Sequence, residues 1–391
     1  MSLSFASALS TSHVTHDAVE EVSHRVRDQL GATPDLAMLF VSHHHGPDFD
    51  SLLGQLYERL QPRHLLGCTG ESIVGVRREV EEQPAISLWA TKMPEVDVRA
   101  MHIDFKATKE GGSFTDWPGD WPEKWPAGAA LFLLGEPYSF PADGLLASLA
   151  EDHPGVPVLG GMASGAHQPG RNRVFLNHKS YNSGAVAALV AGNVHVRAVV
   201  SQGCRPIGRS MIVTKSDANV ILEMAGKPPL AQLQEMYDSL TPEEQQLINQ
   251  GLHVGRVINE YQDKFTRGDF LIRNCVGADR RTGAIAVGDY LKRGQTVQFH
   301  IRDAASADDD LRELLATARQ GGKPPQGALL FTCNGRGTRL FSEASHDAGV
   351  VGELMGDVPL AGFFAQGEIG PVGGQNFLHG FTACVALFSE V

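Results

Sequence analysis

The chain has 391 residues, of which 42% are hydrophobic and 20% are charged, a composition that excludes a disordered chain and predicts a large buried core. At this length we expect two or three domains. The net charge of −12 would repel the phosphates of a nucleic acid, which argues against nucleic acid as a partner.

The first predicted element is an amphipathic helix over residues 15–30. Its apolar residues Val19, Val22 and Val26 recur at helical spacing. A glycine and a proline follow directly and end the helix. The next segment, residues 37–42, predicts a buried strand.

From residue 37 onwards, one pattern occurs three times. Each repeat has a buried strand with a polar tip, an amphipathic helix, a second strand with a glycine-rich tip, and a later apolar strand. The sets are AMLFVSHHH, FDSLLGQLYERL, HLLGCTGE, PAISLWA; AALFLLGEP, ADGLLASLAED, VPVLGGMASG, SGAVAALVAG; and ALLFTCNGRG, SHDAGVVGELMG, VPLAGFFAQGE, GFTACVALF. This order predicts a right-handed parallel crossover followed by a hairpin-like return.

A different region separates the second and third repeats. Residues 196–226 predict strands around a tight turn at 204–208, and Thr241 begins a predicted helix. Further strands and a helix over 307–320 follow. We place the main boundary at Pro228–Pro229, and predict a helical segment at 1–33 and domains at 34–229 and 230–391. The fold class is α/β, with two related α/β domains whose mixed sheets are built from strand–helix–strand–strand units.

Polar residues gather at the predicted strand tips, where α/β proteins bind ligands. The third repeat carries the sharpest set, which is Cys333, Asn334, Arg336, Glu368, Asn376 and His379. Arg336 can hold a carboxylate at two points, and Glu368 can accept an ammonium group. The alternative is that Arg336 and Glu368 pair with each other to hold two loops together.

Several of these motifs resemble the FIST family. FTCNGRG (331–337) and GFFAQGEIGP (362–371), with Asn376 and His379, resemble the C-terminal FIST domain; SQGCRPIG (201–208), LLGCTGESIVG and LGGMASG resemble the N-terminal one. The resemblance implies an intracellular sensory module that binds small ligands such as amino acids. The matching motifs add four ligand-binding candidates, which are Cys68, Glu71, Ser164 and Arg205. We expect no F-box, kinase or receiver segment, so signalling would require a partner protein.

Two other functions stay open as alternatives. An enzyme could use Cys333 or Cys68 as nucleophile with His379 as base, although a buried structural cysteine is the common case. His43, His44 and His45 could suggest a metal site, but adjacent strand residues point to opposite faces, so we expect a solvated tip and no metal. No glycine-rich phosphate motif follows a predicted strand, and no cofactor is expected.

The cysteines and the apolar segments indicate the compartment. The five cysteines form no CxxC pair, which fits free thiols in a reducing compartment. The N-terminus does not resemble a signal peptide, and the apolar stretches 127–135 and 185–192 are too short to cross a bilayer. We therefore expect a cytoplasmic protein without membrane insertion.

Overall fold

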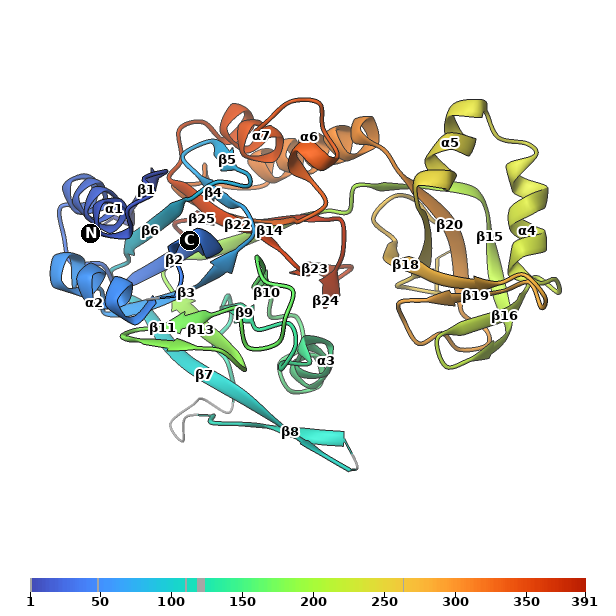
Figure 1. The fold of residues 1–391 in the computed structure, drawn as a ribbon, viewed down its shortest axis with the longest axis horizontal. Coiled ribbons are helices and arrows are strands. Elements are labelled where there is room, and N and C mark those ends of the chain that lie inside the picture. Colours follow the sequence, from blue (N-terminus) through green and yellow to red (C-terminus); the bar gives the residue numbers. More distant parts are fainter. Residues whose placement is uncertain (1, 48, 110, 118–123, 263) are drawn as a thin grey trace. The chain divides into compact units, whose positions relative to one another are not determined.

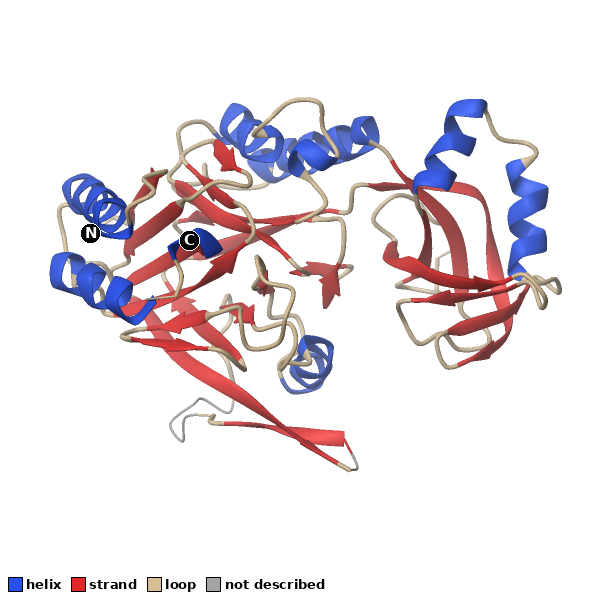
Figure 2. Cartoon of the chain, viewed as in Figure 1, coloured by secondary structure: helices blue, strands red, loops and turns tan. Residues whose placement is uncertain are grey.

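The computed structural model describes residues 2–47, 49–109, 111–117, 124–262 and 264–391 (Figure 1). The chain divides into two compact units. The first comprises Met1–Val200 and Leu311–Val391, and the second comprises Ser201–Asp310. The α/β class with mixed sheets and repeated units is confirmed (Figure 2). The units divide the chain at other places than Pro228–Pro229, so the boundaries 1–33, 34–229 and 230–391 stay predictions.

The first unit contains three repeats of one arrangement. The first repeat comprises β1 (Ser4–Ser10), α1 (Thr15–Leu30), β2 (Leu36–Ser42), η1 (His43–His45), α2 (Phe49–Leu60), β3 (His64–Gly70), β4 (Ile73–Gly75), β5 (Arg78–Val80) and β6 (Ile86–Lys92). The second comprises β7 (Val96–Thr108), β8 (Gly111–Thr115), β9 (Ala130–Gly135), α3 (Ala142–Asp152), β10 (Val158–Met162), β11 (Val174–Leu176), β12 (Lys179–Tyr181) and β13 (Ala185–Gly192). The third comprises β14 (His195–Ser201), α6 (Ala304–Gln320), β21 (Gly327–Cys333), η2 (Gly337–Arg339), α7 (His346–Met355), β22 (Leu360–Ala365), β23 (Glu368–Val372), β24 (Gln375–His379) and β25 (Ala383–Ser389).

Helix α1 shows how local sequence sets an element. Its apolar stripe, which includes Val19, Val22 and Val26, is fully buried against the first sheet. The helix ends at Gly31, whose φ of 63° is left-handed and whose N–H donates to the carbonyl of Arg27. The predicted helix over residues 15–30 is therefore found with the same limits.

Strand pairing follows the predicted pattern in every repeat. The first strand runs parallel to the second and antiparallel to the last, as in β2 with β3 and β6. A glycine of the second strand lies opposite a leucine of the first in each repeat; the pairs are Leu39 and Gly67, Leu133 and Gly160, and Leu330 and Gly362. A Cβ at these glycines would lie 2.1, 1.9 and 1.8 Å from the leucine carbonyl oxygen. Only glycine fits there.

Each sheet is completed by a hairpin from another repeat. The β4–β5 hairpin of the first repeat pairs with β22 of the third, and β11–β12 of the second pairs with β3 of the first. The β23–β24 hairpin of the third repeat pairs with β10 of the second. This cyclic exchange makes the three repeats one folding unit.

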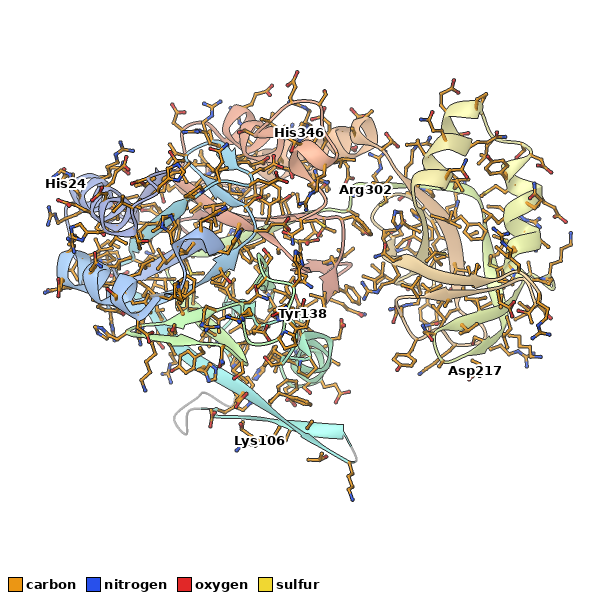
Figure 3. The ribbon with its side chains drawn as sticks, in the orientation of Figure 1. His24, Lys106, Tyr138, Asp217, Arg302 and His346 are labelled. Atoms are coloured by element: carbon orange, nitrogen blue, oxygen red, sulfur yellow. The ribbon has the colours of Figure 1, made fainter. Side chains whose placement is uncertain are left out.

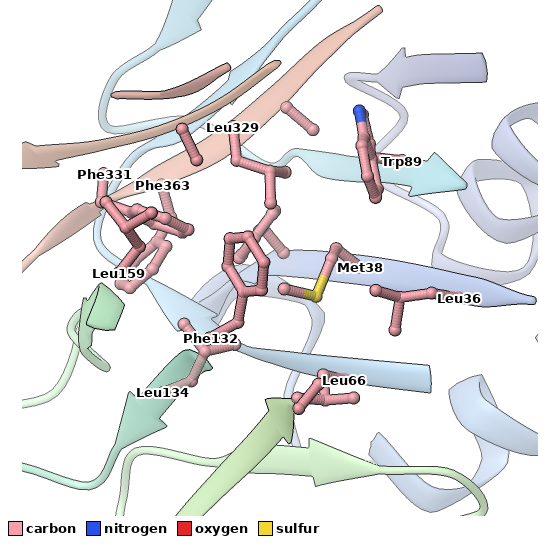
Figure 4. Close-up of a cluster of buried hydrophobic side chains, with 14 of the residues drawn as sticks. Leu36, Met38, Leu66, Trp89, Phe132, Leu134, Leu159, Leu329, Phe331 and Phe363 are labelled. Carbon is pink, nitrogen blue, oxygen red and sulfur yellow. The ribbon is translucent and has the colours of Figure 1, made fainter. Parts of the chain in front are cut away.

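The three sheets bury their inner faces in one common core (Figure 4). Phe40 stacks on Phe363 with ring centroids 5.3 Å apart, and Phe132 stacks on Phe388 at 5.4 Å, so aromatic pairs join different repeats. Helices α1 and α2 cover the outer face of the first sheet, α3 that of the second, and α6 and α7 that of the third. Because both faces are covered, the strands are almost continuously apolar.

The second unit is a closed barrel. Its strands, in spatial order, are β15 (Cys204–Asp217), β16 (Val220–Met224), β19 (Ala284–Val287), β18 (Phe270–Asp279), β17 (Leu252–Val257) and β20 (Thr296–Arg302). Helices α4 (Pro229–Tyr237) and α5 (Pro242–Gln250) pack on the barrel core. The predicted helix start at Thr241 is a capping box with Glu244.

The predicted tight turn at 204–208 is wrong. Those residues begin the long strand β15, in which Gly208 has a φ of 61° and the register shifts between Ile207 and Met211. A glycine bulge bends the strand without reversing it, which periodicity alone does not distinguish from a turn. No helix in the described part of the chain is both long and apolar enough to cross a membrane.

Candidate functional site

The second-strand tips of the three repeats meet inside the first unit. Ser164 connects them through hydrogen bonds. Its N–H donates to the carbonyl of Thr69 at 3.0 Å, and its hydroxyl donates to the carbonyl of Phe364. The same hydroxyl accepts from the N–H of Glu71 at 2.7 Å. Residues from all three repeats are thus bonded to one buried serine.

A cavity of about 430 Å³ opens beside Ser164, at the carboxyl ends of the parallel strands β2 and β3. Its described lining comes from the tip of β2, from β3 and from the loop after β10. The lining residues are His43, Gly46, Pro47, Phe49, Thr69, Ser164, Gly165, Ala166, His167, Gln168, Arg171, Asn172 and Arg173. The position is that of ligand sites in α/β sheets.

The loop after β10 is held rigidly by its own side chains. Buried Asn172 accepts from the N–H of Ala166 at 3.0 Å and donates to the carbonyl of the same residue at 3.3 Å. Arg173 donates to the carbonyls of Gly170 and Asn172 at 2.7 and 2.9 Å, and its own N–H donates to Thr69 at 3.1 Å. The loop therefore presents its basic side chains from a fixed backbone.

Two of those side chains carry charge that the protein does not neutralise locally. Within the described residues, neither Arg171 nor Arg173 has a carboxylate within ion-pair distance. His43 and His167 add two imidazoles to the lining. This part of the cavity can accept a carboxylate or another small anion.

Arg336 lies elsewhere, in a closed cluster of the third repeat. Its guanidinium donates to both oxygens of Asp347, at 2.7 and 2.8 Å, and lies 5.2 Å above the ring of Phe341. Both members of the ion pair are fully buried. Burial alone would lower the pKa of Arg336, but the neighbouring Asp347 carboxylate outweighs it and raises the pKa. The guanidinium of Arg336 therefore already donates its two-point hydrogen bonds to Asp347 and does not offer them to a ligand.

Glu368 and Glu79 are two further buried carboxyl groups. One oxygen of Glu368 accepts from the N–H and hydroxyl of Thr382, at 3.0 and 2.7 Å. One oxygen of Glu79, from the exchanged β5, accepts from the N–H of Ala348 at 2.8 Å. The second oxygen of Glu79 finds no partner among the described residues, and Glu368 has the thiol of Cys333 close enough to lower its pKa slightly. Burial raises the pKa of each group to about 8, and Asp347 adds to the effect at Glu79.

The alternative in which Arg336 pairs with Glu368 is not what the structure shows. The carboxylate of Asp347, at the start of α7, accepts from the guanidinium and from the hydroxyl of Thr332, and the Nδ1 of the neighbouring His346 lies 3.0 Å from it. His346 is labelled in Figure 3. Arg336 lowers the pKa of Glu368 only as a nearby charge. None of the lining residues of the described cavity belongs to this cluster.

The other predicted residues of the third repeat make framework contacts. Asn376 accepts from the N–H of Val158 and donates to the carbonyl of Val156, both at 2.8 Å, which fixes the exchanged hairpin to β10. His379 is buried, and its Nε2 lies 2.9 Å from the carbonyl of Gly370.

Asn334 and Cys333 lie at the tip of β21. The carbonyl of Asn334 accepts from Arg339 at 2.9 Å, and Arg339 also binds the carboxylate of Glu71. The sulfur of Cys333 accepts from the N–H of Gly335 at 3.4 Å. Asn334 and Glu71 are thus brought together through Arg339.

The last two predicted ligand residues are not among the residues that line the cavity. Arg205 belongs to the second unit, where it binds Asp303 and Glu244 at 3.1 and 3.0 Å. Cys68 is fully buried in β3, and burial raises the pKa of its thiol well above the usual range. A buried, protonated thiol is a poor nucleophile, so the structure gives the Cys68 alternative no support.

Ser164 is therefore the predicted ligand residue that lines the cavity, whereas Arg171, Asn172 and Arg173 were not predicted. The only sequence signal for them is their place in AHQPGRNR, directly after the glycine-rich tip. His43 and His44 form an exposed tip as expected, but His45 is buried. No group of three His, Cys, Asp or Glu suited to a metal ion occurs in the described chain.

Comparisons with known proteins identify relatives over nearly the whole chain. A model of the FIST N domain matches residues 35–227, and a model of the FIST C domain matches residues 230–371. An uncharacterized protein of Mycobacterium tuberculosis (strain H37Rv) is 44% identical over 380 residues, which are 96% of this chain and 97% of the relative. An uncharacterized protein of Mycobacterium bovis is 42% identical over 376 residues, or 95% of each chain.

Proposed function

The chain belongs to the FIST family, whose domains are sensory, small-ligand-binding modules of signal transduction, and we propose that its cavity beside Ser164 binds a carboxylate-bearing polar metabolite such as an amino acid. The bound state is then read by a partner protein. The observation that carries the proposal is the pair Arg171 and Arg173, which line an open cavity without a carboxylate partner among the described residues.

The size and position of the cavity support this function. About 430 Å³ lies within the range of small-molecule sites, roughly 300–1,000 Å³. Phe49 and Pro47 line one part of it, and the basic loop lines another. An amino acid could place its carboxylate against the arginines and its side chain against Phe49.

Ser164 offers a route from the cavity to the rest of the unit. Its hydroxyl is bonded to the third repeat at Phe364 and to the first at Glu71, whose carboxylate binds Arg339. A ligand that shifts Ser164 therefore disturbs contacts in all three repeats. We assign Arg336 and Glu368 to the framework of the third repeat, where they set the position of the strand tips.

A thermal-shift screen of L-amino acids and small carboxylic acids tests the proposal. A true ligand at about a hundredfold excess over its dissociation constant should stabilise the protein by roughly 2.7 kcal/mol. Arg171→Gln should weaken binding about ten- to a hundredfold, because it removes a charge-assisted hydrogen bond. Arg173→Lys should weaken it less, since the charge stays while the two-point geometry is lost.

Arg280→Gln is the matched control, since Arg280 is exposed in the second unit. This variant should bind like the wild type. If no compound stabilises the protein, or if a stabilising compound binds Arg171→Gln as tightly as the wild type, the proposal is wrong.

A further inference from the structure

Four histidines lie close to one another, and one of them lines the cavity. His43 lines it, and the ring of His44 lies on that of His43 with centroids 4.0 Å apart. His45 follows in the same short helix η1, and His13, from the connection between β1 and α1, acts electrostatically on both His44 and His45. These imidazoles can carry positive charge next to a cavity that already contains two arginines, so their protonation should affect what the cavity binds.

Two hydrogen bonds hold this group in place. The carbonyl of His43 accepts from the N–H of Gly46 at 3.0 Å and closes the turn. The Nδ1 of His45 lies 3.1 Å from the hydroxyl of Thr15, while its buried Nε2 has no partner in the described chain. These bonds fix the turn and the ring of His45.

Burial and the neighbouring imidazoles lower the pKa values of His44 and His45. Burial lowers the pKa of His44, and His43 and His13 lower it further. Burial lowers the pKa of His45 to about 4, with His44 and His13 adding to the effect. A negative charge close to the group would offset that repulsion.

Among the described residues, no carboxylate lines the cavity beside His43. The carboxylate of Asp50, on α2, is not part of that lining, and it accepts from the hydroxyl of Ser180 at 2.6 Å. Across the cavity lie His167, Arg171 and Arg173. Asp48, which adjoins the turn in sequence, lies outside the described residues.

We propose that an anionic ligand enters this cavity together with protons that the histidine cluster takes up, so that acidification tightens binding. The inference rests on the proposed function and adds its regulation. The anion compensates the positive charge of a protonated His43 or His44, and by thermodynamic linkage the protonated cluster binds the anion more strongly. The occupancy of the cavity then depends on both the pH and the ligand concentration.

Sodium sulfate is the probe, because sulfate keeps its two charges throughout the range from pH 5.5 to 7.5, and any pH dependence then belongs to the protein. Isothermal titration calorimetry should show binding roughly three- to tenfold tighter at pH 5.5 than at pH 7.5, as expected for up to one linked proton. A pH electrode in lightly buffered solution should record uptake of protons when sulfate is added near pH 6.5.

The double variant His43→Gln, His44→Gln should bind sulfate with little pH dependence and take up fewer protons. His24→Gln, an exposed histidine of α1, should behave like the wild type. Sulfate binding that Arg171→Gln weakens, but that is independent of pH, would overturn this inference and leave the anion site standing. A pH dependence that survives in the double variant overturns it as well. No sulfate binding at either pH would overturn the inference and the anion site together.

Discussion

Arg336 and Asp347 form a two-point ion pair in which neither side chain reaches solvent. Asp347 is the second residue of α7, and Asp50 and Asp143 occupy the same position in α2 and α3. All three repeats thus have an aspartate as the second residue of this helix. In the third repeat that aspartate, Asp347, forms an ion pair with the buried Arg336.

Removing one member of this pair should destabilise the protein strongly. Arg336→Met or Asp347→Leu leaves an uncompensated buried charge, and we expect each to lower the free energy of unfolding by about 3–5 kcal/mol. The double variant should recover part of that loss, because no charge is left unpaired. Urea denaturation measures all three.

Arg339→Ala is the control, since Arg339 pairs with Glu71 at a half-exposed position. Its effect should stay below about 1 kcal/mol. An Arg336→Met variant that is as stable as Arg339→Ala would show that the buried pair does not hold the third repeat.

Glu79 and Glu368 should make the protein less stable as the pH rises. Their pKa values are raised from 4.5 to about 8 by burial, so the folded chain holds protons that the unfolded chain has released. The resulting stabilisation is complete below the unfolded value and is lost as the pH rises through about 8. The free energy of unfolding should fall by up to about 1.4 kcal/mol per pH unit for each proton.

Measurement between pH 7 and 8 favours the two acids, because the lowered pKa values of the buried histidines lie well below this range. The buried thiols of Cys68, Cys275 and Cys384 have raised pKa values and add a slope of the same sign mainly above pH 8, where an unfolded thiol ionises at about 8.5. The double variant Glu79→Gln, Glu368→Gln should flatten the slope, and the exposed Glu58→Gln should not change it. If the free energy of unfolding fell with pH as steeply in the double variant as in the wild type, Glu79 and Glu368 would not be the groups responsible.

The glycines opposite the first-strand leucines should tolerate no side chain. Gly362→Ala would place a Cβ 1.8 Å from the carbonyl oxygen of Leu330, and the paired strands would have to separate. We expect a loss of several kcal/mol or no soluble protein. Gly54→Ala is the counterpart in an exposed helix with open space around it, and it should stabilise the protein by up to about 1 kcal/mol. Similar stabilities for both variants would refute the packing argument.

Because hairpins are exchanged, the two sequence domains should not fold separately. A chain of residues 35–227 lacks β23 and β24, which complete the sheet of the second repeat, and its own β4 has no β22 to join. Circular dichroism and thermal melting should show no cooperative unfolding for this fragment. Residues 201–310 form a closed barrel with its own core and should unfold cooperatively alone. Cooperative unfolding of the fragment 35–227, together with none for the fragment 201–310, would contradict the hairpin exchange.

The repeats were predictable from sequence because their periodicity is local. A run such as AALFLLGEP indicates a buried strand without knowledge of its neighbours, and the order of strand, helix and strand implies a parallel crossover. The exchange was not predictable. Strands β4 and β5 have three residues each, too few for a periodic pattern, and β4 pairs with a strand almost three hundred residues away.

The site was predicted only in part, for a related reason. Arg336 was recognised as unusual, but its partner Asp347 lies at a helix start and not on a strand tip. Arg171 and Arg173 lie in a loop, where no periodicity marks residues that face a cavity. Ser164 was found because the glycine-rich tip itself carries it.

Hydrogen–deuterium exchange with and without the stabilising compound from the screen tests the location of the site most directly. We predict that exchange slows most in residues 164–173 and 43–47, which surround the cavity, and less in residues 331–339. Protection confined to the segment around Arg336, or to the barrel at 201–310, would contradict it.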